Sequence, residues 1–474
     1  MKKIAGRRLI VFFGILLVTA GMVVGGSLEA AASPPWLTEK DYIEVTMPQN
    51  ASQAAAQLSE DDMPDIAETL KSPVAWWGNA EGTISTEKRQ TRAEVYAVGG
   101  PYTDFHPVRM LSGSFLSPLE ENGSSIVLDD DLAWQLFGTT DAVGMEVEYE
   151  DRIFTVTGIC GRDTSLLGLL SDSGMNRAYI KYGALDSIPV AGMEAAVPKS
   201  LPGKSLQAVK DALGVQGKPA DAFLVRDVTE GVKLDAETAG LPAIVFAAIL
   251  TGLIIVCVKN AVSGMARGLR GFMEETYFTE SWRFLLRRIA YMTLVIAAGA
   301  GLVCTFWLLA DFPFFLPGRF IPGSWIDAEF YKNLLQSQAR EAIAALEYIP
   351  QPWKIARDAG MQIAGYMNML SFAGMAVFGA GLALMRDARE TGTEKTKGFK
   401  AGIMDIPAVW IFLTASAGIG FLIVSAMGLK TVMPIGRIWM LLGGFTLWSG
   451  WSLYKDRIIN FINRWGNLTL NQNK

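Results

Sequence analysis

The chain has 474 residues, of which 50% are hydrophobic and 19% charged, and its mean hydropathy is +0.26. This is too apolar for a soluble protein of two or three domains, so the sequence predicts a membrane protein. The net charge of −5 provides no basic stripe and argues against a nucleic-acid ligand. Cys160, Cys257 and Cys304 lie in three separate blocks, which excludes a disulfide framework and a cysteine-based zinc site.

Six apolar stretches approach the roughly 20 residues that a membrane span needs. They cover residues 9–26, 240–258, 289–310, 364–385, 406–429 and 433–453. Lysine and arginine gather before the first stretch, between the second and third, between 386 and 400, and in the tail, which marks these segments as cytoplasmic. Arg437 lies inside the last stretch, near one end, where its stem can carry the charge to the headgroups. The pattern predicts six spans with both termini in the cytoplasm.

The first stretch has two interpretations. Lys2, Lys3, an apolar core and the small residues after Glu29 also describe a cleavable signal peptide. The apolar run is longer than a usual signal core, and Gly21 and Gly25 give it a face suited to helix packing. We therefore expect residues 1–32 to remain as a transmembrane helix.

Residues 33–239 form the expected outer domain. Alternating polarity and a following alanine-rich run predict a strand over 41–47 and a helix over 51–71. A second such set is predicted at 193–197 (strand), 205–213 (helix) and 223–228 (strand). The two sets can pair as a split β-α layer near the membrane. Between them, β-rich sequence predicts an insertion subdomain with strands at 82–87, 92–99, 125–128, 145–149 and 153–159. The predicted fold class is an α-helical membrane protein with an α+β extracytoplasmic domain.

The insertion contains an ordered series of short motifs. Residues 130–138 combine a capping acid, an apolar stripe and a glycine stop, which predicts a short helix before a hairpin. The full series is Met110 to Phe115, Ser125 to Leu128, Leu132 to Gly138, Val143-Gly144 and Phe154 to Ile159. In this order it resembles the extracytoplasmic core domain of MacB/FtsX-like ABC transporter permeases. The core-motif residues are Gly113, Phe115, Leu132, Leu136, Phe137, Gly138, Gly144, Val156 and Gly158, and we expect Leu136, Phe137, Val156 and Ile159 to share one core.

The resemblance covers residues 1–310, and the sequence departs from it in two ways. Ser114 stands where the family commonly has arginine, and such permeases usually have four spans. The resemblance implies a permease subunit in a bacterial plasma membrane, with a second permease chain as partner in a homo- or heterodimer. It also implies a separate cytoplasmic ATPase that holds ATP and Mg. The work done would be export, or mechanotransmission to an extracytoplasmic protein.

The residues themselves agree that energy comes from another chain. Apart from Arg437, the predicted spans hold no Asp, Glu, Lys, Arg or His, whereas ion-coupled carriers usually need such groups. Residues 198–205 contain Gly-Lys-Ser, but Pro198 replaces the first glycine of a phosphate-binding loop. We therefore expect a non-catalytic chain with no cofactor and no metal of its own.

The cytoplasmic segment 259–288, within the 240–310 region of the second and third spans, is the predicted coupling element. Helical spacing puts Met265, Leu269, Phe272 and Met273 on one face, with Arg267, Arg270, Glu274 and Glu275 elsewhere. This predicts a short helix across the membrane surface, where the resembling permeases dock their nucleotide-binding subunits. The alternative is an interfacial helix that only returns the chain.

Other segments have plainer interpretations. His106, followed by Pro107, is expected to be a solvated loop residue, and Asp129 to Asp131 a helix cap. The outer segment 311–363 contains a predicted amphipathic helix over 327–347, which could cap the outer domain, line an exit path or lie on the membrane. Residues 364–474 are expected to form three further transmembrane helices and a tail. A receptor or scaffold that binds a protein partner without an ATPase is the alternative function.

Overall fold

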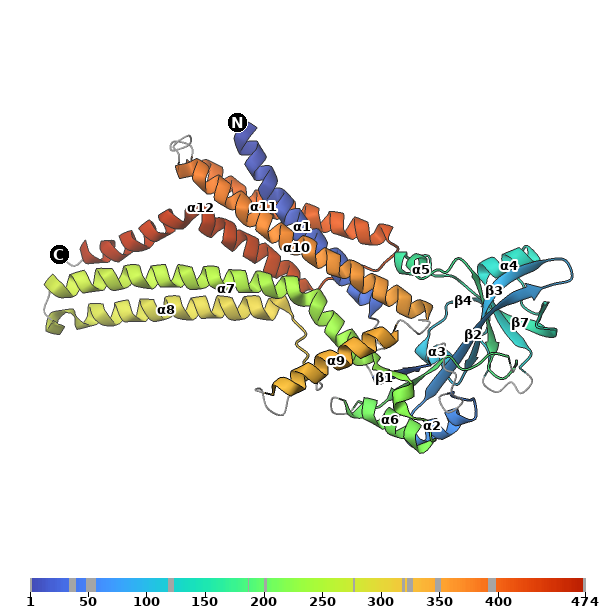
Figure 1. Cartoon of the computed structure of the whole chain (residues 1–474). Coiled ribbons are helices and arrows are strands. Elements are labelled where there is room, and N and C mark those ends of the chain that lie inside the picture. Colours follow the sequence, from blue (N-terminus) through green and yellow to red (C-terminus); the bar gives the residue numbers. More distant parts are fainter. Residues whose placement is uncertain are drawn as a thin grey trace. The chain divides into compact units, whose positions relative to one another are not determined.

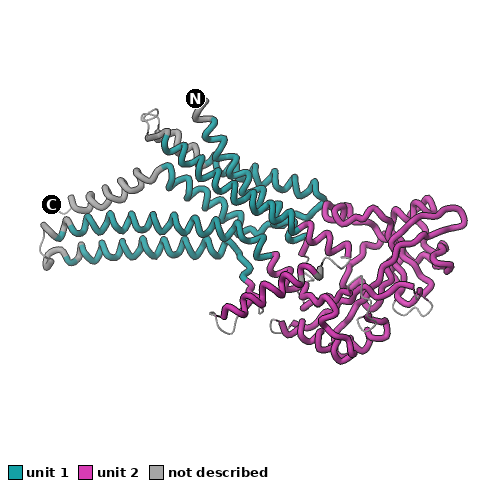
Figure 2. The backbone as a smooth tube through the Cα atoms, in the orientation of Figure 1, with its two compact units in different colours: residues 1–31, 236–314, 361–474 teal, residues 32–235, 315–360 magenta. Residues whose placement is uncertain are grey.

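The structure is a computed structural model that describes most of the chain. The described residues are 2–33, 40–47, 57–117, 123–185, 187–199, 203–275, 278–317, 320–321, 327–345, 351–390 and 398–471. They form two compact units (Figure 2): unit 1 comprises residues 1–31, 236–314 and 361–474, and unit 2 comprises residues 32–235 and 315–360. Residues 315–360 therefore belong with the outer domain.

Unit 2 is built on one mixed sheet of ten strands (Figure 1). The strands are β1 (Asp41–Thr46), β2 (Val74–Ser85), β3 (Gln90–Gly99), β4 (Met110–Gly113), β5 (Ser125–Asp129), β6 (Glu146–Tyr149), β7 (Arg152–Cys160), β8 (Asn176–Lys181), β9 (Gly192–Val197) and β10 (Leu224–Asp227). Their order is β10-β1-β9-β2-β3-β8-β5-β7-β4, and β6 pairs with β2 and β7. All the strands expected from alternating polarity are present, and β4 and β8 are additional.

The expected split layer and insertion subdomain share this sheet. The β2–β3 hairpin is long, with an antiparallel register from Trp76↔Gly99 to Ser85↔Gln90. At one end β2 pairs with β9, and at the other it pairs with β6, so the hairpin joins both parts. The insertion is therefore continuous with the split layer.

Helices cover the sheet of unit 2 in two places. They are α2 (Asp62–Leu70), α3 (Tyr102–Phe105), α4 (Asp130–Phe137), α5 (Leu166–Leu170), α6 (Lys204–Val215) and the 3₁₀ turn Ala220–Ala222. Helix α4 packs on the insertion strands, and α2 and α6 pack together over β1, β2 and β9. The helix expected over 51–71 begins only at Asp62, and residues 48–56 lie outside the described part.

Helix α9 (Ala328–Ala345) is the amphipathic helix expected in the 311–363 segment. Its apolar stripe is exposed: Tyr331 is 38% and Leu335 67% accessible, and Ala339 and Ala342 are exposed as well. The stripe therefore does not pack on the described part of the chain. The predicted helix extended to residue 347, and residues 346 and 347 lie outside the described part.

Unit 1 is a helical bundle formed by all or most of each of six helices. They are α1 (Lys2–Ala32), α7 (Val228–Glu275), α8 (Phe278–Ala310), α10 (Pro352–Glu390), α11 (Gly398–Ala426) and α12 (Ile435–Asn471). Among the described residues, five of these helices are long and apolar enough to cross a membrane, namely all except α12. The sixth span stays a prediction. Arg437 of α12 donates to the carbonyl oxygens of Ala310 and Asp311 at 3.2 Å, which satisfies the C-terminal end of α8.

Small residues bring α1 and α10 into close contact. A Cβ added at Gly14 would lie 2.6 Å from the backbone nitrogen of Phe378, and one at Gly374 would lie 2.7 Å from that of Val18. Gly21 and Gly25, expected to form a packing face, lie against Met367 in the same groove. The first stretch thus packs as the small-residue spacing predicted.

Candidate functional site

The predicted coupling segment is the tip of a long helical hairpin. Helix α7 runs without interruption to Glu275, and α8 begins at Phe278 (Figure 1). The expected short, separate helix is therefore wrong, because α7 continues through this segment without a break.

The residues expected to dock an ATPase lie on the last turns of α7. Met265 and Leu269 are half-buried, and the side chains of Arg267, Arg270 and Met273 are exposed. The side chains of Phe272, Glu274 and Glu275 lie outside the described part. From α8, buried Arg288 reaches over Gly268, where an added Cβ would lie 3.5 Å from its guanidinium. The pair of helices is thus packed together close to its tip.

The core-motif residues of the outer domain fall mostly into one cluster. Leu132, Leu136, Val156 and Ile159 are buried together, and Phe137 packs against them while remaining partly accessible. Three glycines of the motif adopt positive φ, which favours glycine: Gly113 (69°), Gly138 (72°) and Gly144 (86°). Phe115 belongs to a different cluster, where its ring lies 5.5 Å from that of Tyr179. Gly158 lies under Ser114, whose carbonyl oxygen leaves no room for a side chain.

The acidic run Asp129 to Asp131 begins helix α4, as expected. The carboxylate of Asp129 accepts a hydrogen bond from Leu132 N at 2.6 Å and one from Arg177 N at 2.7 Å. Arg162 donates to the same carboxylate at 2.8 Å. Burial raises the pKa of Asp129, and these hydrogen bonds act in the opposite direction. Asp129 therefore has a structural role, because its carboxylate joins the sheet to helix α4.

A second set of charges was not predicted. Glu44 of β1 and Glu194 of β9 are direct partners across the antiparallel pair, and both are buried, at 2% and 3% accessible. Lys354 Nζ donates to Glu44 Oε2 at 2.6 Å, and His106 Nε2 lies 3.2 Å from Glu194 Oε2. We call these four residues the charged cluster. Two carboxylates held side by side in a core repel each other, and Lys354 and His106 lie where they can stabilise them.

Aromatic rings surround His106 of the charged cluster. The ring of His106 lies 4.6 Å from Tyr102, 5.7 Å from Trp353 and 6.0 Å from Trp77. Burial raises the pKa of Tyr102 well above its ordinary value, and Tyr179, Tyr96 and Glu194 add to the effect, so its hydroxyl stays neutral. The expectation that His106 is solvated is wrong, because α3 and the sheet enclose it at 9% accessibility.

The charged cluster fastens the start of α10 to the sheet. Trp353 and Lys354 are in the first turn of that helix, and Arg357 in the next turn pairs with Asp235 of α7. Three consecutive contacts thus connect a predicted span to β1, β9 and α7. Sequence reasoning could not find them, because Glu44 and Lys354 are 310 positions apart.

A second polar contact joins α7 to α10 inside unit 1. Pro242 lies within α7 and has no N–H to donate to the carbonyl of Thr238, four residues earlier. Buried Asn368 of α10 supplies a donor instead, with its Nδ2 2.8 Å from Thr238 O. The weakest point of the helix is therefore supported from its neighbour.

Comparison with known proteins identifies the outer domain. Residues 9–221 match the family described as the MacB-like periplasmic core domain. No curated protein sequence matches the chain. Similar solved structures include the extracellular domain of the noncanonic ABC-type transporter YknZ from Gram-positive bacteria, at 15% identity and TM-score 0.33, covering 39% of this chain and all of that one. The periplasmic region of MacB from Actinobacillus actinomycetemcomitans is 14% identical, with TM-score 0.34, and the match covers 42% and 92% of the two chains. A domain of a putative permease from Porphyromonas gingivalis matches at 13% identity and TM-score 0.29, over 38% and 82%.

The class indicated by the sequence motifs is therefore confirmed. The chain is a membrane protein with a MacB-like periplasmic core domain, and this domain supports its assignment as an ABC-type transporter permease subunit. The family match ends at residue 221, so it does not include α8 to α12 or the charged contacts made by α10.

Proposed function

We propose that this chain transmits the ATP-driven closure of a separate cytoplasmic ATPase to its outer domain, as one of two permease chains. The single observation that supports this best is the continuity of α7. The helix has 48 residues, which corresponds to about 72 Å at 1.5 Å per residue. It passes from unit 2 into unit 1 without a break. A helix of this kind can carry displacement along its own axis.

The outer end of α7 is built into the sheet. Strand β10 leads directly into the helix, and Asp227 Oδ1 accepts from Glu230 N at 2.8 Å. Tyr42 N of β1 donates to Thr229 Oγ1 at 2.9 Å, and Thr229 donates to Lys40 O at 3.1 Å. Movement of α7 would therefore move β1 and β10 with it. The charged cluster would give β1 a second connection, through Lys354 of α10.

The inner end would receive the push from the ATPase. Leu269 is half-buried on the last turns of α7, where its exposed side and the neighbouring Met273 could enter a groove on a partner. Hot spots of this type are apolar anchors surrounded by polar side chains, as Arg267 and Arg270 are here. The outer domain would then serve either export or mechanotransmission to an extracytoplasmic protein. Which of the two it serves depends on the partner that it binds.

The first experiment is purification of the full chain from its native membrane, with identification of the proteins that accompany it. We expect an ATPase without membrane spans, whose ATP hydrolysis responds to this chain in nanodiscs. Leu269→Asp, alone or with Phe272→Asp, should abolish the response because a carboxylate would enter the groove without solvation. The matched control is Ser263→Asp, which adds the same charge to another face of α7 at an exposed position. A normal response in the Leu269 variants would exclude this tip as the coupling element. Absence of any ATPase would favour a receptor or scaffold.

The Pro242 contact allows a separate test of transmission through α7. Asn368→Leu removes the donor to Thr238 O and should loosen α7, which increases amide hydrogen exchange around residue 242. Pro242→Ala restores a backbone N–H and should rescue that variant, because the new amide can donate to Thr238 O itself. If Pro242→Ala leaves the exchange of the Asn368 variant unchanged, the contact does not support the helix.

A further inference from the structure

The short helix α5 of the outer domain has one packed side and one exposed apolar side. It comprises Leu166–Leu170, with leucine at every position except Gly168. Leu167 is 5% accessible, whereas Leu169 is 65% and Leu170 44% accessible. Two neighbouring leucines are therefore presented on the surface of unit 2.

Polar contacts hold α5 in place at both ends. Ser165 caps its N-terminus, since its Oγ accepts from Gly168 N at 3.2 Å and donates to Asp163 Oδ2 at 2.9 Å. At the other end, Arg177 of β8 donates to Ser171 O at 3.0 Å. The exposed leucines thus belong to a loop of fixed structure.

Leu167 places α5 at the outer end of two candidate spans. A Cβ added at Gly360 of α10 would lie 2.9 Å from Leu167 Cδ2 and 3.4 Å from Ala32 Cβ, so the three residues meet. Ala32 ends the first candidate span and comes three residues after Glu29. Gly360 comes two residues after Asp358, the last charged residue before the apolar run of α10. Charges are costly inside the bilayer, so both helices cross its outer surface close to α5.

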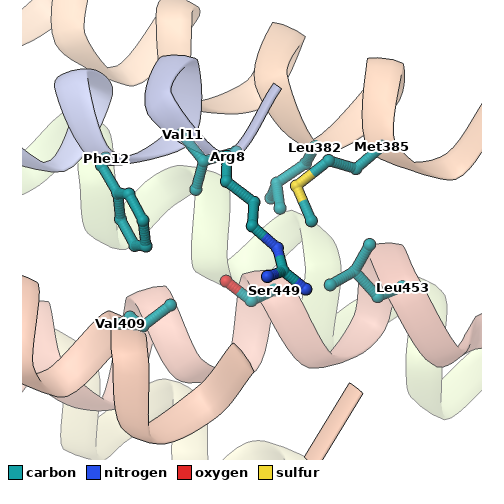
Figure 3. Close-up of a pocket in the computed structure, with 8 residues that line it drawn as sticks. All are labelled: Arg8, Val11, Phe12, Leu382, Met385, Val409, Ser449 and Leu453. Atoms are coloured by element: carbon teal, nitrogen blue, oxygen red, sulfur yellow. The ribbon is translucent and has the colours of Figure 1, made fainter. Parts of the chain in front are cut away.

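Lipid meets this chain at its surface and not inside the bundle at the pocket that Arg8 and Ser449 line. That pocket, among α1, α10, α11 and α12 (Figure 3), has a volume of about 20 Å³, which is room for about one water molecule. An acyl chain does not fit there. Exposed apolar side chains close to the bilayer are therefore the places where lipid contact is expected.

We propose that Leu169 and Leu170 insert into the outer leaflet and attach the outer domain to the membrane surface. Leucine side chains gain free energy when they leave water, and α5 lies at the level where they can do so. Asp163 and Asp172 flank the helix, and neighbouring Arg162 pairs with Asp172 at 3.6 Å. The attraction therefore comes from the acyl region of the leaflet and not from an anionic headgroup. Because this loop joins β7 to β8, the insertion strands are tied to the membrane directly.

Spin labels measure what surrounds α5 in the full chain in nanodiscs. After the span cysteines are replaced, Leu169→Cys and Leu170→Cys are labelled with a nitroxide. The labels should be accessible to oxygen, which dissolves in lipid, and shielded from a water-soluble nickel chelate. Ile153→Cys is the matched control, because Ile153 is 64% accessible and lies about 23 Å from the end of β7 that leads to α5, at about 3.3 Å per residue. Its label should be accessible to the nickel chelate.

The two reagents separate the possible surroundings of α5. High nickel accessibility at Leu169 and Leu170, equal to that at Ile153, would mean that water surrounds them. Low accessibility to both reagents would mean that a protein surface covers them, such as a second copy of this chain. Either result overturns the proposal.

A label-free variant checks the same attachment. Leu169→Gln with Leu170→Gln keeps side chains of similar helix propensity and leaves buried Leu167 in place. Loss of the lipid contact should make the amides of residues 166–171 exchange about tenfold faster in nanodiscs, while the exchange of α4 and β5 stays unchanged. Ile153→Gln should leave residues 166–171 unaffected. Native exchange of these amides in the double variant would exclude the leaflet as their support.

Discussion

Removing the cation from Glu44 should open the base of the outer domain. In Lys354→Met, the carboxylate of Glu44 stays buried at 2% accessibility without its partner at 2.6 Å. Breaking a buried ion pair in this way costs about 3–5 kcal/mol. The neighbouring Glu194 makes the loss worse, because two charges about 5 Å apart across a strand pair repel by about 3 kcal/mol at an effective dielectric of about 20.

Hydrogen exchange of the full chain in nanodiscs measures this local cost. We expect the amides of β1, β9 and the first turns of α10 to exchange roughly two to four orders of magnitude faster in Lys354→Met, from the roughly 3–5 kcal/mol above. The control is Arg92→Met, which breaks an exposed pair with Glu81 whose side chains are 71% and 51% accessible. An exposed pair contributes about 0–1 kcal/mol, so exchange should change little.

The double variant Glu44→Gln with Lys354→Met separates charge from packing. It removes the unpaired carboxylate and its repulsion with Glu194, so exchange should return most of the way to that of the native chain. If the double variant is as open as Lys354→Met, then the lysine acts through packing and the reasoning from charge is refuted.

Two further predictions concern the core and the topology. Leu136→Ala should lower the stability of the outer unit by about 2–5 kcal/mol, and Phe137→Ala should cost less because Phe137 is partly accessible. Hydrogen exchange over α4 and β7 measures both variants, and a larger effect of Phe137→Ala would contradict the packing. A cysteine at exposed Ser173 should react with a membrane-impermeant thiol reagent in intact cells, and one at exposed Ser263 should not. The span cysteines are first replaced, while Cys160 stays, because burial raises its pKa to about 12; labelling at Ser263 alone would invert the predicted topology.

Sequence patterns predicted those parts of the fold that depend on local periodicity. Alternating polarity gave β1, β7 and β9, and a capping acid followed by a glycine gave α4 almost to the residue. Strand β8 was missed although Ala178 and Ile180 alternate with partly exposed residues, because the run is short and carries three polar side chains. The length of β2 was also underestimated, because Trp76 and Trp77 do not alternate in polarity. As a result, the sequence did not show that the split layer and the insertion share one continuous sheet.

The end of α7 shows a different limit. The spacing of Met265 and Leu269 predicts an amphipathic helix, but spacing carries no information on whether a helix begins anew or continues a span. Gly264 directly precedes Met265 but does not end α7, which accommodates it within the helix. The helix therefore continues, and the apolar side chains lie along the hairpin rather than across the membrane surface.

The charged cluster could not be predicted because each member looks ordinary in its own segment. Glu44 alternates in a strand, His106 precedes a proline, and Lys354 begins a helix in a segment assigned no function. Only the register that pairs Glu44 with Glu194 brings the two carboxylates together beside Lys354 and His106, and register is a property of the folded sheet. The same register gives helix α10 a role in the outer domain. Helix α10 lies beyond the part that matches the MacB-like domain, yet its first turn neutralises β1 of that domain. A chain without Lys354 would leave the carboxylate of Glu44 buried without its cation, so strand β1 and the first turn of α10 depend on each other.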